Sequence, residues 1–383
     1  MAASNLINLA VGFVAVGVGF LMFKSLPKPE PRNHSLPKPE PEPRQQSDDL
    51  PFLSVIIPAR NESARITPLL ESLNGQNLRS FEVLVVDDDS SDNTAAVAEN
   101  LGAQVLQRKG ERQGAGKSAA CWYGANQAKG EWLLFLDADT YFSSADGLQN
   151  LLLSYKEKGA KGILALQPFH TVRKLYENLS AVFNIIVIVG MNGFTAWGDR
   201  FQTAGSFGPC ILTNKDDYFL SGGHKKIEGA LMDDLALGEA FLDKNLPVRC
   251  LGGKGIISFR MYPEGFKSLV EGWCKSFAIG SKSTHPLVMG MTVIWIAGSF
   301  ISANALISAI ASADTAAMIM SSLLYMVYAV QTGLFARRCG DFPWFIFLFH
   351  PVLFLFFIGL FMYSSFRVNV LHTVTWKGRK INV

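Results

Sequence analysis

The sequence predicts an α/β protein with a doubly wound, mostly parallel sheet, and it predicts membrane-spanning helices at both ends of the chain. Between Phe52 and Phe266, short apolar runs alternate with amphipathic stretches, which is typical of strand–helix–strand units. Long apolar segments precede and follow this region. One buried-type strand, residues 132–136, ends at Asp137 and Asp139, and open α/β sheets bind ligands outside the carboxyl ends of their strands.

Composition narrows the class of protein. Of the 383 residues, 17% are charged and 49% are hydrophobic, a balance too apolar for an ordinary soluble enzyme. The net charge is only +3 and the basic residues are scattered, so we expect no nucleic-acid partner. The five cysteines are widely spaced without a C-x-x-C pair, which argues against a disulfide framework or a structural zinc site.

The first 50 residues predict an anchor and a spacer. Residues 1–24 contain an unbroken apolar run without an obvious cleavage site, so we expect an uncleaved transmembrane anchor. Basic residues follow this run, which places the next segment in the cytoplasm by the positive-inside rule. Residues 25–50 are rich in proline and contain SLPKPEP twice, which indicates a semi-stiff spacer or, alternatively, a protein-binding repeat.

Residues 51–280 are expected to form the α/β domain. The predicted strands lie at 53–58, 81–86, 104–107 and 132–136, and the predicted helices at 66–73, 94–102 and 117–129. The segment 179–194 is apolar but too short to span a bilayer. We therefore expect it to be a helix that lies at the membrane surface.

Residues 281–363 are expected to form C-terminal membrane helices, followed by a basic tail at 364–383. The stretches 287–311 and 316–336 are each long enough to span a bilayer. The sequence thus predicts a multi-pass protein of the cell membrane whose α/β domain faces the cytoplasm.

A third C-terminal segment, residues 344–363, is less regular. It contains His350 and Pro351, which are tolerated in a membrane where a helix is broken or faces protein. A third full span would also place the basic tail outside, against the positive-inside rule. We therefore expect this segment to be re-entrant.

Asp137 and Asp139 form the first candidate site. Side chains two residues apart on a strand point to the same side, so both carboxylates would leave the sheet edge together. Such a pair suits a hard divalent cation that keeps water ligands and is completed by substrate phosphates. The alternative is a polar turn that closes a core strand.

Two other stretches carry acids beside helix starts. Asp87, Asp88 and Asp89 end the second strand, where they could accept hydrogen bonds from a base or a ribose. The alternative is that the residues after them, Ser90, Ser91 and Asp92, only cap the next helix. Asp233 and Asp234 come where a helix begins, so they either favour the helix dipole or supply a catalytic base.

The segment 114–118 resembles a phosphate-binding loop. The Walker spacing needs glycine at position 111, which is Glu111, so a nucleotide hydrolase is disfavoured. The glycines and Lys117 remain available to approach a phosphate or a base. Farther along, Trp273 lies beside charges at the junction with the membrane part, as an interface anchor or as a wall of an acceptor site.

Together these residues resemble the inverting family 2 glycosyltransferases, which have a GT-A fold. The matching stretches are 58–62 (PARNE), 86–94, 116–118, 137–139 and 233–234, in the order of the family. Further stretches resemble a membrane-bound branch that acts on carotenoid acids, namely 208–209, 212–217, 222–224, 259–262, 264–266 and 376–379. The family's Q-x-x-R-W motif is absent, and residues 271–275 stand in its place, which argues against a processive polysaccharide synthase.

The resemblance implies roles by position. Residues implied to bind the UDP-sugar are Pro58, Arg60, Glu62, Asp88, Lys117 and Asp137. Asp139, with Asp137, is implied to ligate a Mg²⁺ or Mn²⁺ ion that bridges the diphosphate. Asp234 matches the family's general base, and Asp233 is the acid before it.

The resemblance also implies the reaction. We expect inverting transfer of glucose from UDP-glucose to the carboxylate of a C30 carotenoid acid held in the lipid bilayer. An acceptor of another lipid class, such as a diacylglycerol or a polyprenyl compound, is the first alternative. A non-catalytic nucleotide-binding scaffold at the membrane is the second.

Overall fold

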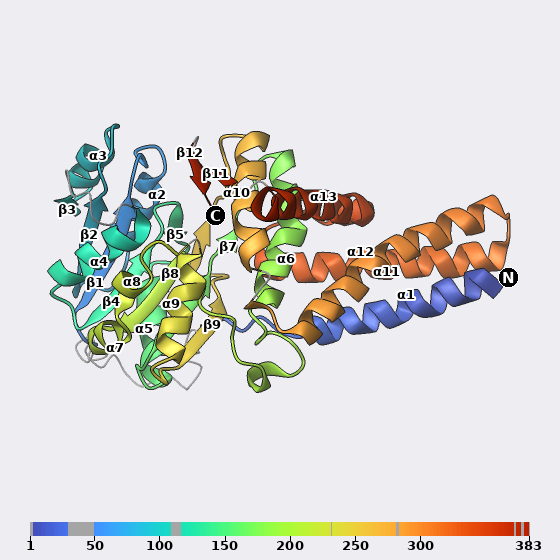
Figure 1. Cartoon of the computed structure of the whole chain (residues 1–383), viewed down its shortest axis with the longest axis horizontal. Helices are drawn as coiled ribbons and strands as arrows, with labels where there is room; N and C mark the ends of the chain where they lie inside the picture. Colours follow the sequence, from blue (N-terminus) through green and yellow to red (C-terminus); the bar gives the residue numbers. More distant parts are fainter. Residues whose placement is uncertain are drawn as a thin grey trace, which may run out of the picture. The chain divides into compact units, whose positions relative to one another are not determined.

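The computed structural model describes residues 3–29, 50–108, 116–230, 232–280, 283–370, 373–376 and 379–382 (Figure 1). Two units divide the chain. The α/β unit comprises Pro27–Phe169 and Gly205–Arg260, and the helical unit comprises Met1–Leu26, His170–Ala204 and Met261–Val383. Most of the predicted spacer and part of the glycine-containing loop at 114–118 lie outside the described residues.

The α/β unit contains the predicted alternation of strands and helices. Its strands are β1 (Leu53–Ala59), β2 (Phe81–Asp87), β3 (Gln104–Gln107), β4 (Trp132–Leu136), β5 (Thr140–Phe142), β6 (Ile163–Gln167), β8 (Cys210–Asn214), β9 (Val248–Gly252) and β10 (Ile257–Phe259). Its helices are α2 (Ile66–Asn74), α3 (Thr94–Asn100), α4 (Lys117–Gln127), α5 (Gly147–Glu157), α7 (Lys215–Ser221), α8 (Gly223–Lys226) and α9 (Asp233–Leu242). The short strand β7 (Phe169–His170) completes a small sheet of order β5-β10-β7.

The main sheet has seven strands in the order β3-β2-β1-β4-β8-β6-β9. β1 pairs in parallel with β2 and β4, β2 with β3, and β6 with β9. β8 runs antiparallel to both β4 and β6. The predicted doubly wound, mostly parallel sheet is therefore confirmed, with β8 as the reversed strand.

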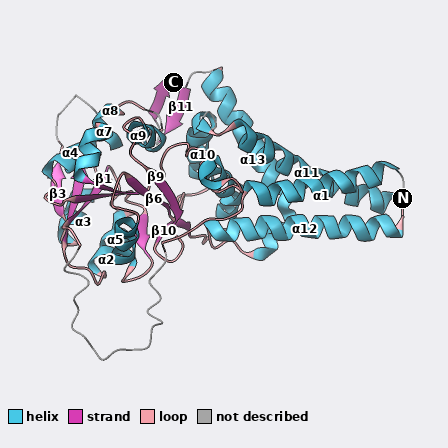
Figure 2. Cartoon of the chain, turned by 90° about the horizontal axis from the view of Figure 1, so that it is seen from below, coloured by secondary structure: helices cyan, strands magenta, loops and turns pink. Residues whose placement is uncertain are grey.

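Side-chain alternation along the strands creates two apolar faces. Val55 and Leu134 belong to a core cluster that includes buried residues of α2 and α5. Ile56 lies on the opposite face, where it is close to Gly124 of α4, and Phe135 stacks near Tyr218 at 5.1 Å between ring centroids. Figure 2 accordingly shows helices on both faces of the sheet.

The helical unit contains the long apolar helices. Its elements are α1 (Ala3–Met22), η1 (Leu175–Ser180), α6 (Ala181–Gly190), η2 (Gly198–Arg200), α10 (Phe266–Gly280), α11 (Pro286–Ala311), α12 (Thr315–Cys339), η4 (Trp344–Phe349), α13 (His350–Asn369), β11 (Thr373–Trp376) and β12 (Arg379–Asn382). Among the residues that the structure describes, four helical segments are long and apolar enough to cross a membrane: Asn5–Met22, Pro286–Ala311, Thr315–Cys339 and Trp344–Val368.

Polar contacts join three of these helices. α1, α11 and α12 lie side by side in both views (Figures 1 and 2). The Gln331 side-chain amide of α12 donates to the Val16 carbonyl of α1 at 2.7 Å, and its oxygen accepts from the Trp295 indole of α11 at 3.0 Å. Side-chain hydrogen bonds of this kind hold helices together where the surroundings are apolar.

The short apolar segment predicted at 179–194 contributes α6 to the helical unit. We expected residues 51–280 to form one domain with a helix on the membrane surface at 179–194. In the structure, α6 is packed inside the helical unit, and seven of its ten residues are buried, including Phe183 and Asn184. Its apolar side chains are thus covered by protein, and its position at a membrane surface stays a prediction.

Trp273 is a core residue of the helical unit. Its ring stacks on Phe183 at 4.9 Å between centroids, and its indole N–H donates to the Ser180 hydroxyl at 3.0 Å. Its side chain therefore packs with α6 and η1, in a role that neither of the two predicted alternatives describes.

The His350-Pro351 pair lies where the 3-10 helix η4 ends and the α-helix α13 begins. α13 starts at His350 and runs without a break to Asn369, with proline in its first turn. Proline is favoured there because the first helical N–H groups have no intrahelical partner. The proline therefore gives no evidence of a broken helix, and the re-entrant topology stays a prediction.

We predict that the core cluster supplies much of the stability of the α/β unit. Leu134→Ala removes a fully buried side chain of β4 and should lower the free energy of unfolding by about 2–5 kcal/mol. Leu220→Ala, at a position that is 60% exposed, should change it by less than about 0.5 kcal/mol. Thermal unfolding in detergent compares the two variants, and equal losses would contradict the assignment of the core.

Candidate active site

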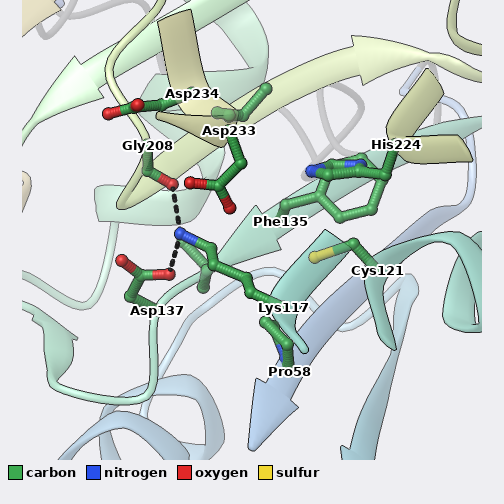
Figure 3. A pocket seen from close by; sticks show the side chains of 11 residues that line it. Pro58, Lys117, Cys121, Phe135, Asp137, Gly208, His224, Asp233 and Asp234 are labelled. Atoms are coloured by element: carbon green, nitrogen blue, oxygen red, sulfur yellow. Dashed lines mark hydrogen bonds and ion pairs between the residues drawn. The ribbon is translucent and has the colours of Figure 1, made fainter. Parts of the chain in front are cut away.

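The candidate site lies at the carboxyl ends of β1 and β4, beside the first residues of α4 and α9 (Figure 3). All of its residues belong to the α/β unit. A small cavity of about 10 Å³ is lined by Pro58, Lys117, Cys121, Phe135, Leu136, Asp137, Gly208, Ile211, His224, Asp233 and Asp234. The structure thus brings together five residues that the sequence analysis had singled out, namely Pro58, Lys117, Asp137, Asp233 and Asp234.

Lys117 stands at the centre of the site. Its Nζ lies 2.6 Å from Asp137 Oδ1 and 3.5 Å from the Gly208 carbonyl oxygen. Figure 3 shows the Asp233 carboxylate directed toward the same ammonium group. Burial lowers the pKa of Lys117, but the charges of Asp137 and Asp233 outweigh burial and raise it above its ordinary value. The lysine is therefore held as a cation.

Asp137 and Asp139 follow β4 in a tight turn. The Asp137 N–H donates to the Pro209 carbonyl at 3.0 Å, and the Thr140 N–H donates to the Asp137 carbonyl at 3.1 Å. The predicted alternative, a turn that closes the strand, is thus present together with the carboxylate pair. Burial, followed by the charge of Asp137, raises the pKa of Asp139 to about 7.

This pair fits a divalent cation that shares its ligands with a substrate. The described part of the chain contains no cluster of three or more His, Cys, Asp or Glu side chains positioned for a metal ion. Two carboxylates leave most coordination positions to water and phosphate oxygens, as is usual for Mg²⁺. A cation would also offset the repulsion that raises the pKa of Asp139.

Asp88 forms a second charged group near the end of β2. Its carboxylate lies 2.7 Å from Arg108 Nη1, accepts from the Gly116 N–H at 3.0 Å, and lies 3.9 Å from Arg60 Nη1. Arg108 was not identified from the sequence, because a single basic residue after a short strand belongs to no motif that would mark it as a site residue. The Gly116 N–H belongs to the loop before α4, so Asp88 fixes the start of the helix that carries Lys117.

Two acids near Asp88, namely Asp87 and Asp92, accept hydrogen bonds from nearby backbone N–H groups. Asp87 accepts from the Ser90 N–H at 3.0 Å. Asp92 accepts from Thr94 and Ser63, and these hydrogen bonds outweigh burial and lower the pKa of Asp92 to about 2. Of these two acids, Asp92 accepts from the first residue of α3, as the capping alternative predicted, whereas Asp87 closes the turn before it. The Asp88 carboxylate lies beside the arginines instead.

Glu62 is placed at the start of α2. Its carboxylate lies 4.0 Å from Arg65 Nε, and its N–H donates to the Thr94 hydroxyl at 2.9 Å. The charges of Arg65 and Glu62 also act on the pKa of Asp139, with opposite signs, so Glu62 lies on the Asp139 side of the site.

Asp233 and Asp234 begin α9 and differ in orientation. In Figure 3 the Asp233 carboxylate is directed toward Lys117, whereas the Asp234 carboxylate is directed away from it. Asp234 Oδ1 accepts from the Leu235 N–H at 3.0 Å. Burial and then the charge of Asp233 raise the pKa of Asp234 to about 6.

A glycine permits this approach of α9. A Cβ added to Gly208 would lie 2.9 Å from the Asp234 Cβ, closer than real Cβ contacts. The loop that supplies the Gly208 carbonyl to Lys117 can therefore pass directly beside the two acids.

Two further lining residues are neutral. Burial lowers the pKa of His224 to about 3, so its ring carries no charge near neutral pH. Its Nδ1 lies 2.9 Å from the Tyr218 hydroxyl, and its ring is 4.8 Å from that of Phe135. Burial also raises the pKa of the Cys121 thiol. Both side chains form the apolar back wall of the site, and Cys121 was not identified from the sequence.

Lys117→Met tests the balance of charge. It leaves Asp137 and Asp233 without their cation, and the loss is limited because Lys117 and Asp137 are about one-third exposed. We expect a destabilisation of about 1–2 kcal/mol at pH 8. The loss should shrink toward pH 5, because the folded variant binds more protons than the unfolded chain and so loses stability as pH rises.

Thermal unfolding between pH 5 and pH 8 measures this effect. Lys158→Met removes the same charge from an exposed position of the α/β unit and should change stability little at either pH. A penalty for Lys117→Met that does not depend on pH would argue against the proposed balance.

Comparisons with known proteins agree with this geometry. The glycosyl transferase family 2 profile matches residues 54–201. The 4,4'-diaponeurosporenoate glycosyltransferase of Staphylococcus aureus strain USA300 is 38% identical over 333 residues, covering 86% of this chain and 88% of that protein. The enzyme of the same name from strain MRSA252 gives the same identity and coverage.

A solved structure shares the fold. A mannosyltransferase from Pyrobaculum calidifontis, in complex with GDP-Man and Mn²⁺, has a TM-score of 0.52 and 16% sequence identity, and the match covers 94% of this chain and 99% of that one. Similarity at this level of identity supports the GT-A fold. With the long match to curated relatives, the conclusion is that the chain belongs to glycosyl transferase family 2 and is a sugar-transferring enzyme.

Proposed function

We propose that this enzyme transfers glucose from UDP-glucose to the carboxylate of a C30 carotenoid acid, 4,4'-diaponeurosporenoate, and forms a glycosyl ester with inversion at the anomeric carbon. The observation that carries the acceptor is the 38% identity, over 86% of the chain, to enzymes named for that acid. Four helices apolar enough to cross a membrane suit an acceptor that is dissolved in lipid.

The donor would bind at the sheet edge around Lys117. We assign Pro58, Arg60, Glu62, Asp88, Lys117 and Asp137 to UDP-sugar binding. The Lys117 ammonium would attract the diphosphate, because it is held as a cation at the helix N-terminus. A Mg²⁺ or Mn²⁺ ion held by Asp139 and Asp137 would supply Lewis-acid stabilisation of the charge on the departing diphosphate.

The acid pair at the start of α9 would position the acceptor. A carboxylic acid has a pKa near 4, so the acceptor is already ionised near neutral pH and needs no base to remove a proton. Its carboxylate oxygen forms the new bond to the anomeric carbon while the bond from that carbon to the diphosphate oxygen breaks. Asp234, whose pKa is raised to about 6, can hold a proton in mildly acidic medium and so repel the acceptor less.

We also propose that the α/β unit faces the cytoplasm of the cell. Lys24 and Lys28 follow the first apolar helix, and Arg337 and Arg338 end α12. Both groups lie on the cytoplasmic side if α1, α11 and α12 span the membrane, in agreement with the positive-inside rule.

Asp139→Asn tests the metal role. We expect turnover to fall by at least about 100-fold, because a neutral amide is a weaker ligand for a hard cation and does not offset its charge. UDP release from UDP-glucose, with the polyene acid supplied in lipid nanodiscs, measures this loss. A chelator should inactivate the wild type, and Mn²⁺ or Mg²⁺ should restore it.

Asp216→Asn is the matched control, since it makes the same change at an exposed position of α7. It should keep full turnover. An Asp139→Asn protein that folds and keeps metal-dependent turnover would contradict the proposed role of Asp139.

Asp234→Asn separates the classes of acceptor. With a carboxylate acceptor we expect a loss of less than about tenfold, because no proton has to be removed. With a hydroxyl acceptor, loss of a general base should cost about 10²–10⁴-fold. Mild alkali provides the product control, because it releases the sugar from a glycosyl ester, whereas the glycosidic bond to a diacylglycerol or a polyprenyl alcohol is stable to base and keeps the sugar attached to the glycerol or the polyprenyl chain.

A further inference from the structure

A second cavity lies in the helical unit, between α10 and α13. Its volume is about 340 Å³, and its lining residues are Phe266, Lys267, Val270, Glu271, Cys274, Tyr363, Ser364 and Arg367. The two helices lie side by side in both views (Figures 1 and 2). They are joined by a hydrogen bond from the Ser364 hydroxyl to the Cys274 carbonyl at 2.5 Å, and by Phe266 and Phe356 at 5.9 Å between ring centroids.

The charges that line this cavity favour an anion. Two of the eight lining residues, Lys267 and Arg367, are cations, and Glu271 is the one acid among them. Lys267 Nζ lies 4.0 Å from Glu271 Oε1, one turn along α10. Cys274 adds no charge near neutral pH, because burial raises its pKa to about 11.

Arg367 is held beside an aromatic ring. Its guanidinium carbon lies 5.8 Å from the centroid of the Tyr363 ring, and its Nη1 donates to the Tyr363 hydroxyl at 3.4 Å. A cation in the last turn of a helix is also favoured by the helix dipole, but this general effect does not require a cavity. A planar guanidinium that lines a cavity can bind a carboxylate through two parallel hydrogen bonds.

Aromatic and aliphatic side chains from the end of a candidate span and from α10 line the rest of the cavity. Phe266 is 50% exposed and Tyr363 is 48% exposed. Tyr363, Ser364 and Arg367 lie in the last turns of the segment Trp344–Val368, which is apolar enough to cross a membrane. Cavities that bind organic ligands have volumes of about 300–1,000 Å³, so this one could take a charged head and the first part of an apolar chain.

We propose that the cavity between α10 and α13 binds the carboxylate head of a long-chain carboxylic acid, with Arg367 as the main cation and Lys267 as the second. Phe266 and Val270 contact the first carbons, and the rest of the chain extends into lipid, since a C30 chain exceeds the cavity. The further statement that this acid is the carotenoid acceptor rests on the proposed function. The existence of a site for a long-chain carboxylic acid does not depend on it.

Photolabelling of the intact protein in lipid nanodiscs tests this site. The probe is palmitic acid that carries a diazirine in its chain and a terminal alkyne, and its methyl ester is the uncharged control. Labelled peptides are mapped by mass spectrometry. Labelling of α10 and α13, normalised to that of α1, should be about tenfold stronger with the acid than with the ester, as expected for a charge-assisted hydrogen bond.

Variants assign the charge. Arg367→Ala should reduce labelling of α10 and α13 by the acid to the level of the ester, whereas Arg367→Lys should retain about half of it. Arg79→Ala removes the same charge from an exposed position of the α/β unit and should leave labelling unchanged. The comparison of acid with ester in the wild type needs no variant, so the test survives if Arg367→Ala fails to fold.

The outcomes separate this proposal from the proposed function. Equal labelling by acid and ester, or full labelling of Arg367→Ala, would overturn the site even if glucose transfer is intact. Loss of acid labelling when phosphatidylglycerol replaces phosphatidylcholine in the nanodisc would also overturn it, in favour of a phospholipid headgroup. Labelling that depends on Arg367, in a protein that transfers no glucose to the polyene acid, would support the site and refute the proposed acceptor.

Discussion

The ion pair between Lys117 and Asp137 is the interaction on which the rest of the site depends. Its 2.6 Å distance joins the first residue of α4 to the residue that follows β4, and the Asp233 carboxylate of α9 is directed to the same ammonium. Two elements that are distant in sequence thus present acids to one cation, which a third element supplies. Without that cation, their like charges would repel one another in a partly buried place, where water screens poorly.

The strands and their polar ends were predictable, because short apolar runs bounded by acids and glycines admit few other structures. β1, β2, β3 and β4 begin where the sequence indicated, and each ends within one residue of the expected position. The orientation of Asp233 and Asp234 was not predictable. Successive residues of a helix point about 100° apart, so the sequence pair alone does not say which carboxylate faces Lys117. That choice depends on how α9 packs beside Gly208.

In the helical unit, the sequence predicted which segments are apolar helices but not what covers them. Hydropathy measures how apolar a segment is, but not whether lipid or protein covers it. α6 therefore read as a helix for a membrane surface, although Phe183 is buried against Trp273. For a similar reason, the sequence left open whether Pro351 breaks a helix or lies in one that faces protein. A proline inside an apolar run and a proline at the start of a helix have the same sequence signature until the helix start is known.

Charge also limits how the proposed reaction can proceed. A sugar diphosphate and an ionised acceptor both bring negative charge to a place that already holds Asp137, Asp139, Asp233 and Asp234 around Lys117. One ammonium does not balance this sum, so further positive charge has to arrive with the donor as a divalent cation, or as protons on the acids. The pKa values of Asp139 and Asp234 are raised to about 7 and about 6, so both carboxyl groups can take up a proton in mildly acidic medium. Above those pH values they are ionised and attract a cation. If the proposed cation binds here, metal binding and proton uptake at this sheet edge would be coupled, because each relieves the same repulsion.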